Sequence, residues 1–301
     1  MRVALLYEHP TWSIELLSRL DERGVDVTPI DVGVADARLP LGDEMPFDLW
    51  VNRVNMMPSA GRPRSVVAAT SHLLLSLEMR GQRVINGART HLIGSSKLAQ
   101  VELFGGLGLR APATIGVSDP AQLMAAAGRL GFPVLTKPNI GGSGQGIARY
   151  DNAQQLRAAV TANLVDLGID GTGVVQKVID SSDGLVHRIE MLAGTLFYAT
   201  RQPIQDGVFN YCAADGCAVG GAGASIEVVE PDPEIVGRAA QIMEAASADV
   251  GGVEYLVDVD TGQPCFYDFN PYSNFITGHH QQLGFDPIDR YIDAVLADPA
   301  G

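Results

Sequence analysis

The sequence has little positive charge and no long apolar run. Of its 301 residues, 21 are Lys or Arg and 35 are Asp or Glu, which gives a formal net charge of -14. Because no basic stretch offsets this charge, we expect neither nucleic acid nor a membrane surface as a partner. No uninterrupted apolar segment reaches the ~20 residues that cross a bilayer. Residues 1–8 are too short and too soon polar for a secretory signal, so a cytoplasmic protein is expected.

Cysteine is also scarce. Cys212, Cys217 and Cys265 are an odd number without the spacing of a metal site, which predicts reduced thiols. The chain is 46% hydrophobic and 19% charged, a composition that excludes a disordered protein. Its length exceeds the usual size of one compact domain, so we expect two or three packed lobes, with a homo-oligomer left open.

Lysine is the scarcest of the charged residues. Only Lys97, Lys137 and Lys177 stand among the 21 basic residues, and the others are arginines. Such a chain uses Arg for its general surface charge and keeps Lys where a compact ammonium on a flexible stem is needed. The segments around these lysines are therefore candidate functional segments.

Periodicity divides the chain into three parts, over 1–93, 94–178 and 179–301. The first part predicts a parallel sheet with helices on its faces, from strands over 3–7, 25–30, 49–54 and 83–86 and helices over 13–23 and 65–79. The second has a helix capped by Ser95, helices over 119–130 and 152–164, and strands over 113–117, 132–137 and 174–179. The third has strands over 185–192, 196–201, 209–213, 225–229, 253–259 and 265–270, and helices over 231–249 and 287–297.

A glycine-rich loop follows Lys137. It contains Gly141, Gly142, Ser143, Gly144, Gln145 and Gly146, between the strand that ends at Lys137 and a short strand that ends at Tyr150. Glycines let backbone amides approach a phosphate and adopt positive φ, and the lysine adds a point charge. No Gly-Lys-Ser/Thr follows, which excludes a Walker A loop, and the strand after the loop excludes a dinucleotide fingerprint. The alternative is a flexible hairpin without a ligand.

Two acids and an amide form a second candidate site. Asp268 and Asn270 are two residues apart on an expected strand, so they share one face. Antiparallel pairing across the turn at 260–263 brings Glu254 beside them. Buried carboxylates at this range repel unless a cation lies between them, and hard oxygen donors suit Mg²⁺ that bridges ATP phosphates. The alternative is a solvated hairpin face without a metal.

In this order and spacing, the lysine segments and the acidic hairpin resemble the ATP-grasp superfamily, and within it the RimK-like carboxylate–amine ligases, over most of the chain. The resemblance implies an α/β fold of α+β lobes, the ATP-grasp fold, with an N-terminal Rossmann-like domain before it. It makes Lys97 and Lys137 the nucleotide lysines and 141–146 the lid over the β- and γ-phosphates. It also makes the acidic hairpin a site for Mg²⁺, as two ions.

The resemblance assigns further residues. Arg188 is similar to the arginine that neutralises an acyl phosphate, and with Lys137 it is a candidate catalytic residue. The other nucleotide residues are Gln176, Lys177 and Val178 at the adenine edge, Asp183 or equally Asp180 at the ribose, and Arg201 near the triphosphate. Lys177 stands where the family commonly has an acid, so backbone atoms of Lys177 and Val178 are expected to bond the adenine.

The substrate side departs from the family pattern. After Asn270 the chain has Pro271-Tyr272-Ser273-Asn274-Phe275 in place of a Pro-Gly turn, and Ser273 and Asn274 are expected to face the acceptor. Arg53 ends a strand of the first domain, where ligands of parallel sheets lie, and it is a candidate for holding a substrate carboxylate. Arg62 or Arg64 are the alternatives for this role.

These features predict an enzyme that uses ATP to phosphorylate a small-molecule carboxylate, after which an amine attacks to give an amide, ADP and phosphate. Specialised metabolite biosynthesis is a fitting setting. One alternative is an intramolecular version that closes the ring of a small amino acid, as the ATP-grasp enzyme of D-cycloserine biosynthesis does. Others are a phosphotransferase that acts on a hydroxyl and a non-catalytic nucleotide-binding module.

Overall fold

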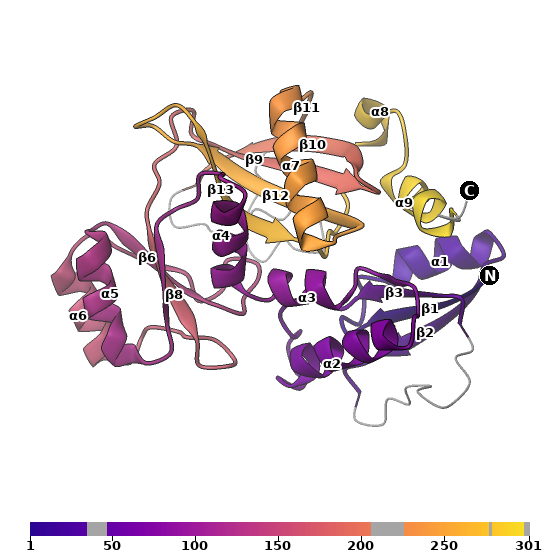
Figure 1. Cartoon of the computed structure of the whole chain (residues 1–301), viewed down its shortest axis with the longest axis horizontal. Coiled ribbons are helices and arrows are strands. Elements are labelled where there is room, and N and C mark those ends of the chain that lie inside the picture. The colour runs from indigo at the N-terminus through magenta and orange to yellow at the C-terminus, as the bar shows by residue number, and fades with distance from the viewer. Residues whose placement is uncertain (35–46, 206–225, 277–278, 298–301) are drawn as a thin grey trace.

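A computed structural model gives the structure of residues 1–34, 47–205, 226–276 and 279–297. The strand expected over 209–213, and with it Cys212 and Cys217, lies outside these residues. Figure 1 shows the N-terminal sheet beside the C-terminal sheet, while α5 and α6 cover a smaller central sheet at the end remote from α9. No helix of the described ranges is long and apolar enough to cross a membrane.

The N-terminal part is a four-stranded parallel sheet of order β2-β1-β3-β4, which confirms the predicted arrangement. Its elements are β1 Arg2–Tyr7, α1 Ile14–Glu22, β2 Asp26–Asp31, β3 Leu49–Arg53, α2 Val66–Met79 and β4 Val84–Ile85. Strands β1 and β3 are buried on both faces. Alternate side chains pack either against α2, as Leu6 and Trp50 do, or toward α1 and the C-terminal helix, as Leu5 and Val51 do.

The central part begins with two short helices, α3 Ala88–Gly94 and α4 Lys97–Gly106. The sequence did not predict α3, and the cap of α4 is Ser96 rather than Ser95. Ser96 has an extended backbone and its Oγ accepts from Ala99 N at 3.1 Å, whereas Ser95 closes α3 and donates its hydroxyl to the carbonyl of Leu92.

The central sheet has the order β5-β8-β6-β7 and is antiparallel. Its strands are β5 Thr114–Val117, β6 Val134–Pro138, β7 Ala148–Tyr150 and β8 Gly173–Lys177, and its helices are η1 Pro120–Gln122, α5 Leu123–Leu130 and α6 Ala153–Thr161. One face packs on α5 and α6 around Leu123 and Leu156. The loop between β6 and β7 is the glycine-rich segment.

The C-terminal part is a five-stranded antiparallel sheet of order β11-β10-β9-β12-β13. Its elements are β9 Leu185–Leu192, β10 Thr195–Pro203, β11 Glu227–Val229, α7 Pro233–Ala246, β12 Val250–Val257, β13 Pro264–Asn270, α8 His280–Leu283 and α9 Pro287–Leu296. Helices α4 and α7 cover one face, where Phe104 meets Phe266. Helix α9 instead packs beside α1 on the N-terminal sheet, so one core joins both ends of the chain.

Candidate active site

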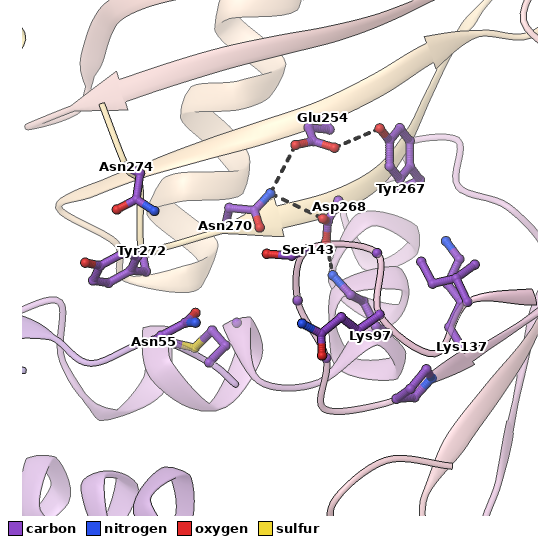
Figure 2. Close-up of a pocket in the computed structure, with 18 of the residues that line it drawn as sticks. Asn55, Lys97, Lys137, Ser143, Glu254, Tyr267, Asp268, Asn270, Tyr272 and Asn274 are labelled. Atoms are coloured by element: carbon purple, nitrogen blue, oxygen red, sulfur yellow. Dashed lines mark hydrogen bonds and ion pairs between the residues drawn. The ribbon is translucent and has the colours of Figure 1, made fainter. Parts of the chain in front are cut away.

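A cavity lies where the N-terminal domain, the glycine-rich loop and the C-terminal sheet meet (Figure 2). It brings together most of the residues predicted for the phosphate, metal and reaction site. These are Lys97, Lys137, Gly141, Gly142, Ser143, Gly144, Gln145, Arg188, Glu254, Asp268, Asn270 and Asn274. Gly146 lies in the same loop, at its return to β7.

Lys97 and the base of the loop are joined through Asn139. The carbonyl of Asn139 accepts from the backbone of Lys97 at 3.0 Å, and its Oδ1 accepts from Leu98 N at 3.0 Å and from Ser96 Oγ at 3.1 Å. These contacts satisfy donors at the start of α4, which otherwise have no partner within the helix. Lys97 then extends from this helix start to an ion pair with Asp268.

Lys137 lies on β6, immediately before the loop, and its side chain is 7% exposed. Its Nζ is 5.7 Å from the centre of the Tyr267 ring. Burial and the neighbouring Lys97 lower the pKa of Lys137 to about 8. A buried ammonium of this kind gains most from an anionic ligand, because a phosphate would supply the missing opposite charge.

The loop is shaped by its backbone. Ser143, Gly144 and Gly146 have φ of 51°, 69° and 71°. A Cβ at Gly146 would lie 2.6 Å from Pro138 Cγ, so both the positive φ and the lack of space for a side chain require glycine here. At the loop tip, a Cβ at Gly142 would lie 3.7 Å from Met57 Cβ, which shows that the loop reaches the N-terminal domain.

The acidic pair occupies directly opposed positions on β12 and β13, as the hairpin pattern predicted. Glu254 pairs with Asp268, and the register then shifts so that Tyr255 pairs with Phe266. Tyr267 is the extra residue of this bulge, and its hydroxyl donates to Glu254 Oε2 at 2.7 Å. The amide of Asn270 donates to Glu254 Oε1 at 3.4 Å and to Asp268 Oδ2 at 3.3 Å (Figure 2).

The two carboxylates have opposite electrostatic environments. Burial, together with Asp268, raises the pKa of Glu254 despite the nearby Arg188. Burial alone would also raise the pKa of Asp268, but Lys97 holds it below its usual value. Two buried carboxylates and an amide offer hard oxygen donors of the kind that fits Mg²⁺, provided that the Asn270 amide turns its oxygen toward the acids in place of the nitrogen that faces them here. The ammonium of Lys97 supplies positive charge to the same set.

Arg188 is fixed between two acids. On β9, its Nε donates to Glu190 Oε1 at 2.6 Å and its Nη1 donates to Glu254 Oε1 at 2.8 Å, with 11% of its side chain exposed. Burial alone would lower the pKa of Arg188, but Glu190 and Glu254 raise it above its ordinary value. Ser273 donates its hydroxyl to the same Glu190 oxygen at 2.8 Å, so the segment after β13 is bonded to the support of Arg188.

The residues predicted at the adenine lie outside this cavity. Gln176 is buried and its amide donates to Thr114 Oγ1 at 2.9 Å, while Lys177 Nζ donates to the carbonyls of Gly131 and Phe132. The backbone N–H groups of Lys177 and Val178 donate hydrogen bonds to the carbonyls of Ala113 and Pro133. These N–H groups are therefore engaged within the protein.

Four other predicted residues also lie apart from the cavity. Asp183 accepts from Ser181 and is paired with His187, and Arg201 forms an exposed ion pair with Glu227. Arg53 is 4% exposed and donates to the carbonyl of Ser273, and Ser273 is itself fully buried. The structure brings Arg53 and Ser273 to the boundary between the domains, behind the cavity wall.

Sequence reasoning missed eight lining residues, namely Trp12, Asn55, Met56, Gly94, Pro138, Ile147, Tyr267 and Tyr272. Trp12 and Asn55 follow the carboxyl ends of β1 and β3, the edge at which parallel sheets bind ligands, so their position was a usable signal. No sequence signal placed Tyr267 in the cavity, because only the bulge turns its side chain to this face.

No family model matches the sequence, and no curated protein matches it. Solved structures do. The RimK domain ATP-grasp protein from Sphaerobacter thermophilus is 19% identical with a TM-score of 0.69, over 99% of this chain and 100% of that one. The ATP-grasp ligase PsnB, solved with a minimal precursor, is 16% identical with a TM-score of 0.68, over 98% and 99%. D-alanine–D-alanine ligase from Bacillus anthracis, solved with ATP, is 16% identical with a TM-score of 0.67, over 98% and 97%.

The chain has the ATP-grasp fold. The three similarities extend over nearly the full length of both chains, so the N-terminal parallel sheet, the central sheet and the C-terminal sheet together belong to the shared architecture. This confirms the fold that the lysines, the glycine-rich loop and the acidic hairpin predicted. Within the ATP-grasp fold, the loop of residues 139–147 is hereafter called the lid.

Proposed function

We propose that this chain is an ATP-dependent ligase that activates a small-molecule carboxylate as an acyl phosphate and transfers the acyl group to an amine. One observation carries the proposal: a single cavity holds Lys97, Lys137, the lid, Arg188 and the acidic hairpin. Cations and a glycine loop suit a triphosphate, and hard oxygen donors suit Mg²⁺. That the similar structures include two ATP-grasp ligases, PsnB and D-alanine–D-alanine ligase, supports the same reading.

The proposed reaction has two steps. A carboxylate oxygen of the substrate forms a bond to the γ-phosphorus of ATP while the bond to the β,γ-bridging oxygen breaks, which gives an acyl phosphate and ADP. The amine nitrogen then bonds to the acyl carbon, and phosphate leaves with one oxygen of the original carboxylate. The amine loses a proton to the solvent or to the leaving phosphate.

Each group of the cavity has a proposed part in these steps. Lys97 and Lys137 hold the phosphates, and the lid amides turn toward them and exclude water. Arg188 faces the reacting carboxylate and offsets the charge that develops on the acyl phosphate. Glu254, Asp268 and Asn270 would hold Mg²⁺, which when bound neutralises phosphate charge and orients the γ-phosphoryl group.

For the adenosine, we keep the proposal that Gln176, Lys177, Val178 and Asp183 lie along it. Strand β8 is the direct neighbour of β6, which carries Lys137, so its end lies one strand away from the phosphate site. Because the N–H groups of Lys177 and Val178 are engaged, we propose that carbonyl oxygens of this segment accept from the adenine amino group. Arg201, with its partner Glu227, is proposed as a more remote charge.

An isotope experiment tests the proposal. The protein is incubated with ATP, Mg²⁺ and pools of amino acids labelled with ¹⁸O in the carboxylate. Hydroxylamine is added as the amine, and the masses of the products are measured by mass spectrometry. A ligase gives hydroxamates and phosphate that carries one ¹⁸O. A ring-closing ligase gives a product short of one water without any added amine. A phosphorylated product that retains the label indicates a hydroxyl phosphotransferase, and absence of ADP indicates a binding module; either result contradicts the proposal.

A further inference from the structure

One end of the cavity is lined by uncharged side chains. Trp12, Asn55 and Met56 come from the N-terminal domain, and Tyr272 and Asn274 come from the segment after β13. Figure 2 shows Asn55, Tyr272 and Asn274 grouped at the end remote from Lys137. This group of five residues is called the distal end.

The ionised lining residues of the described chain all belong to the phosphate end. Lys97 is paired with Asp268, Arg188 is paired with Glu254, and Lys137 lies near the ring of Tyr267 beside them. A carboxylate or ammonium of a substrate that entered the distal end would lose water there without gaining an opposite charge from these five residues.

The distal end presents rigid flat surfaces. The rings of His9 and Trp12 are stacked with centroids 4.0 Å apart at 12°, and Trp12 lies 5.7 Å from Tyr272. Tyr272 also contacts the guanidinium of Arg53, with Cζ 4.2 Å from the ring centroid. These contacts join the two domains and limit the rotation of both lining aromatics.

The distal end also contains an amide available for recognition. Asn55 is only half-buried, and its side chain makes no hydrogen bond within the described residues. An amide offers both a donor and an acceptor, so it pairs with a neutral polar group without leaving a charge unbalanced.

We propose that the distal end binds an uncharged, planar part of the substrate, a carboxamide or an aromatic ring, remote from the carboxylate that reacts. This inference rests on the proposed function, because it concerns a carboxylate activated in the same cavity. Trp12 and Tyr272 supply the flat surfaces, and Asn55 supplies hydrogen bonds in the plane of a carboxamide.

Arg53 supports the main rival, a second carboxylate on the substrate. It is a buried cation with Nε unpaired among the described residues, and its Nη2 donates to a backbone carbonyl, that of Ser273. Three rings, those of Tyr272, Phe275 and Tyr291, surround its guanidinium at 4.2 to 5.7 Å. The ring of Tyr272 therefore separates Arg53 from the cavity, and the observations favour a neutral group.

Binding of four acids of similar length tests the inference. Glutaramate ends in a carboxamide, 3-phenylpropanoate in a ring, glutarate in a carboxylate and 5-aminopentanoate in an ammonium. Calorimetry is performed with Mg²⁺ and a non-hydrolysable ATP analogue. We expect glutaramate or 3-phenylpropanoate to bind at least ~10-fold more tightly than both charged acids, and the tighter of the two identifies the planar group. Equal binding of all four, no detectable binding, or preference for glutarate or 5-aminopentanoate overturns the inference.

A matched pair of variants locates the preference. Asn55→Asp adds one negative charge at the distal end and should shift relative affinity toward 5-aminopentanoate by at least ~10-fold. Asn163→Asp makes the same change at an exposed position of the central part and should leave the preference unchanged. An unchanged preference in folded Asn55→Asp overturns the inference. Because binding is measured without turnover, a preferred acid that binds but is never activated contradicts the proposed function alone.

Discussion

Gly252 leaves no room for a methyl group beside Arg188. An ideal Cβ at Gly252 would lie 2.6 Å from Arg188 Nη2, 2.7 Å from Nε and 2.8 Å from Cζ, and these are its three nearest atoms. The guanidinium is thus held by a bare backbone on one side and by Glu190 and Glu254 at its nitrogens. Its direction is set by three neighbours that do not themselves need to touch the substrate.

Gly252→Ala should therefore displace Arg188 and lower kcat by about 100-fold, the cost of a misplacement near 1 Å. The fold should survive, because the φ of Gly252 is not in the left-handed region and the three nearest atoms all belong to a side chain, that of Arg188. Phosphate release checks the rate and thermal unfolding checks the fold. Gly237→Ala on α7, where a Cβ meets nothing within 4 Å, is the control. Equal rates for the two variants would contradict this role of Gly252.

Glu190→Gln should raise the Mg²⁺ concentration required for half-maximal turnover. Glu190 is 1% exposed and neutralises Arg188; without its charge, Arg188 relies on Glu254 alone and competes with the metal for that carboxylate. Folding stability should also fall, by about 3 kcal/mol, because a buried ion pair loses one partner. Ser273→Ala removes the other bond to the same oxygen but no charge, and it should leave the Mg²⁺ requirement near that of the wild type.

Asp268→Asn should lower turnover far more than it lowers folding stability. The change keeps the shape of the side chain and removes one of the two carboxylates proposed to hold Mg²⁺. Turnover is measured against Mg²⁺ concentration for this variant, for the wild type and for Asp260→Asn, which changes an exposed acid in the turn of the same hairpin. Coincident curves for wild type and Asp268→Asn would show that the metal is bound elsewhere.

Lys137→Ala should weaken ATP binding by at least ~10-fold, the usual loss for a hydrogen bond between charged groups. The folded state should not lose stability, because burial already lowers the pKa of this ammonium to about 8 and disfavours its charge. Arg129→Ala is the control, since it removes an exposed cation of α5 in the same central part, outside the cavity. Titration with labelled ATP compares the two; equal affinities would remove Lys137 from the phosphate site.

Protonation of His91 should lower the folding stability of the protein in mild acid. His91 is fully buried, and burial lowers its pKa to about 4 from 6.5. Because the unfolded chain binds the proton more readily, stability is complete above pH 6.5 and falls as the pH decreases toward 4, by about 3 kcal/mol from this residue. Urea unfolding at pH 7.5 and 5 should show a smaller decrease in His91→Leu than in the wild type. His72→Leu, at an exposed position of α2, should behave as the wild type does.

Local patterns in the sequence predicted those parts of the site that lie within one hairpin or one loop. Glu254 and Asp268 were paired correctly because strand periodicity and a turn determine register. Tyr267 was missed because a bulge cannot be read from alternation. The end of β3 was recognised as a ligand edge, yet Asn55 lines the cavity rather than Arg53, since the direction of a side chain after a strand depends on tertiary packing.

Contacts between distant segments were the least predictable. Helix α4 follows the N-terminal domain in sequence and was assigned to the central part, but it packs on the C-terminal sheet through Phe104 and Phe266. The distal end likewise combines a loop after β1, a loop after β3 and the segment after β13. The sequence pattern of each element could be recognised. Which elements pack together depends on contacts between segments more than 200 residues apart in the chain, such as the hydrogen bond from Arg53 to Ser273.

The bonds of Asn139 fix the root of the lid to the start of α4. Because Asn139 secures the start of α4 through its backbone and its side chain, Lys97 and the strand that carries Lys137 are held together before any glycine of the loop begins. In the proposed ligase, a tip that moved beyond this residue would leave the spacing of the two cations unchanged. Each new triphosphate would then meet a preset pair of charges, and only the glycine tip would need to be reordered.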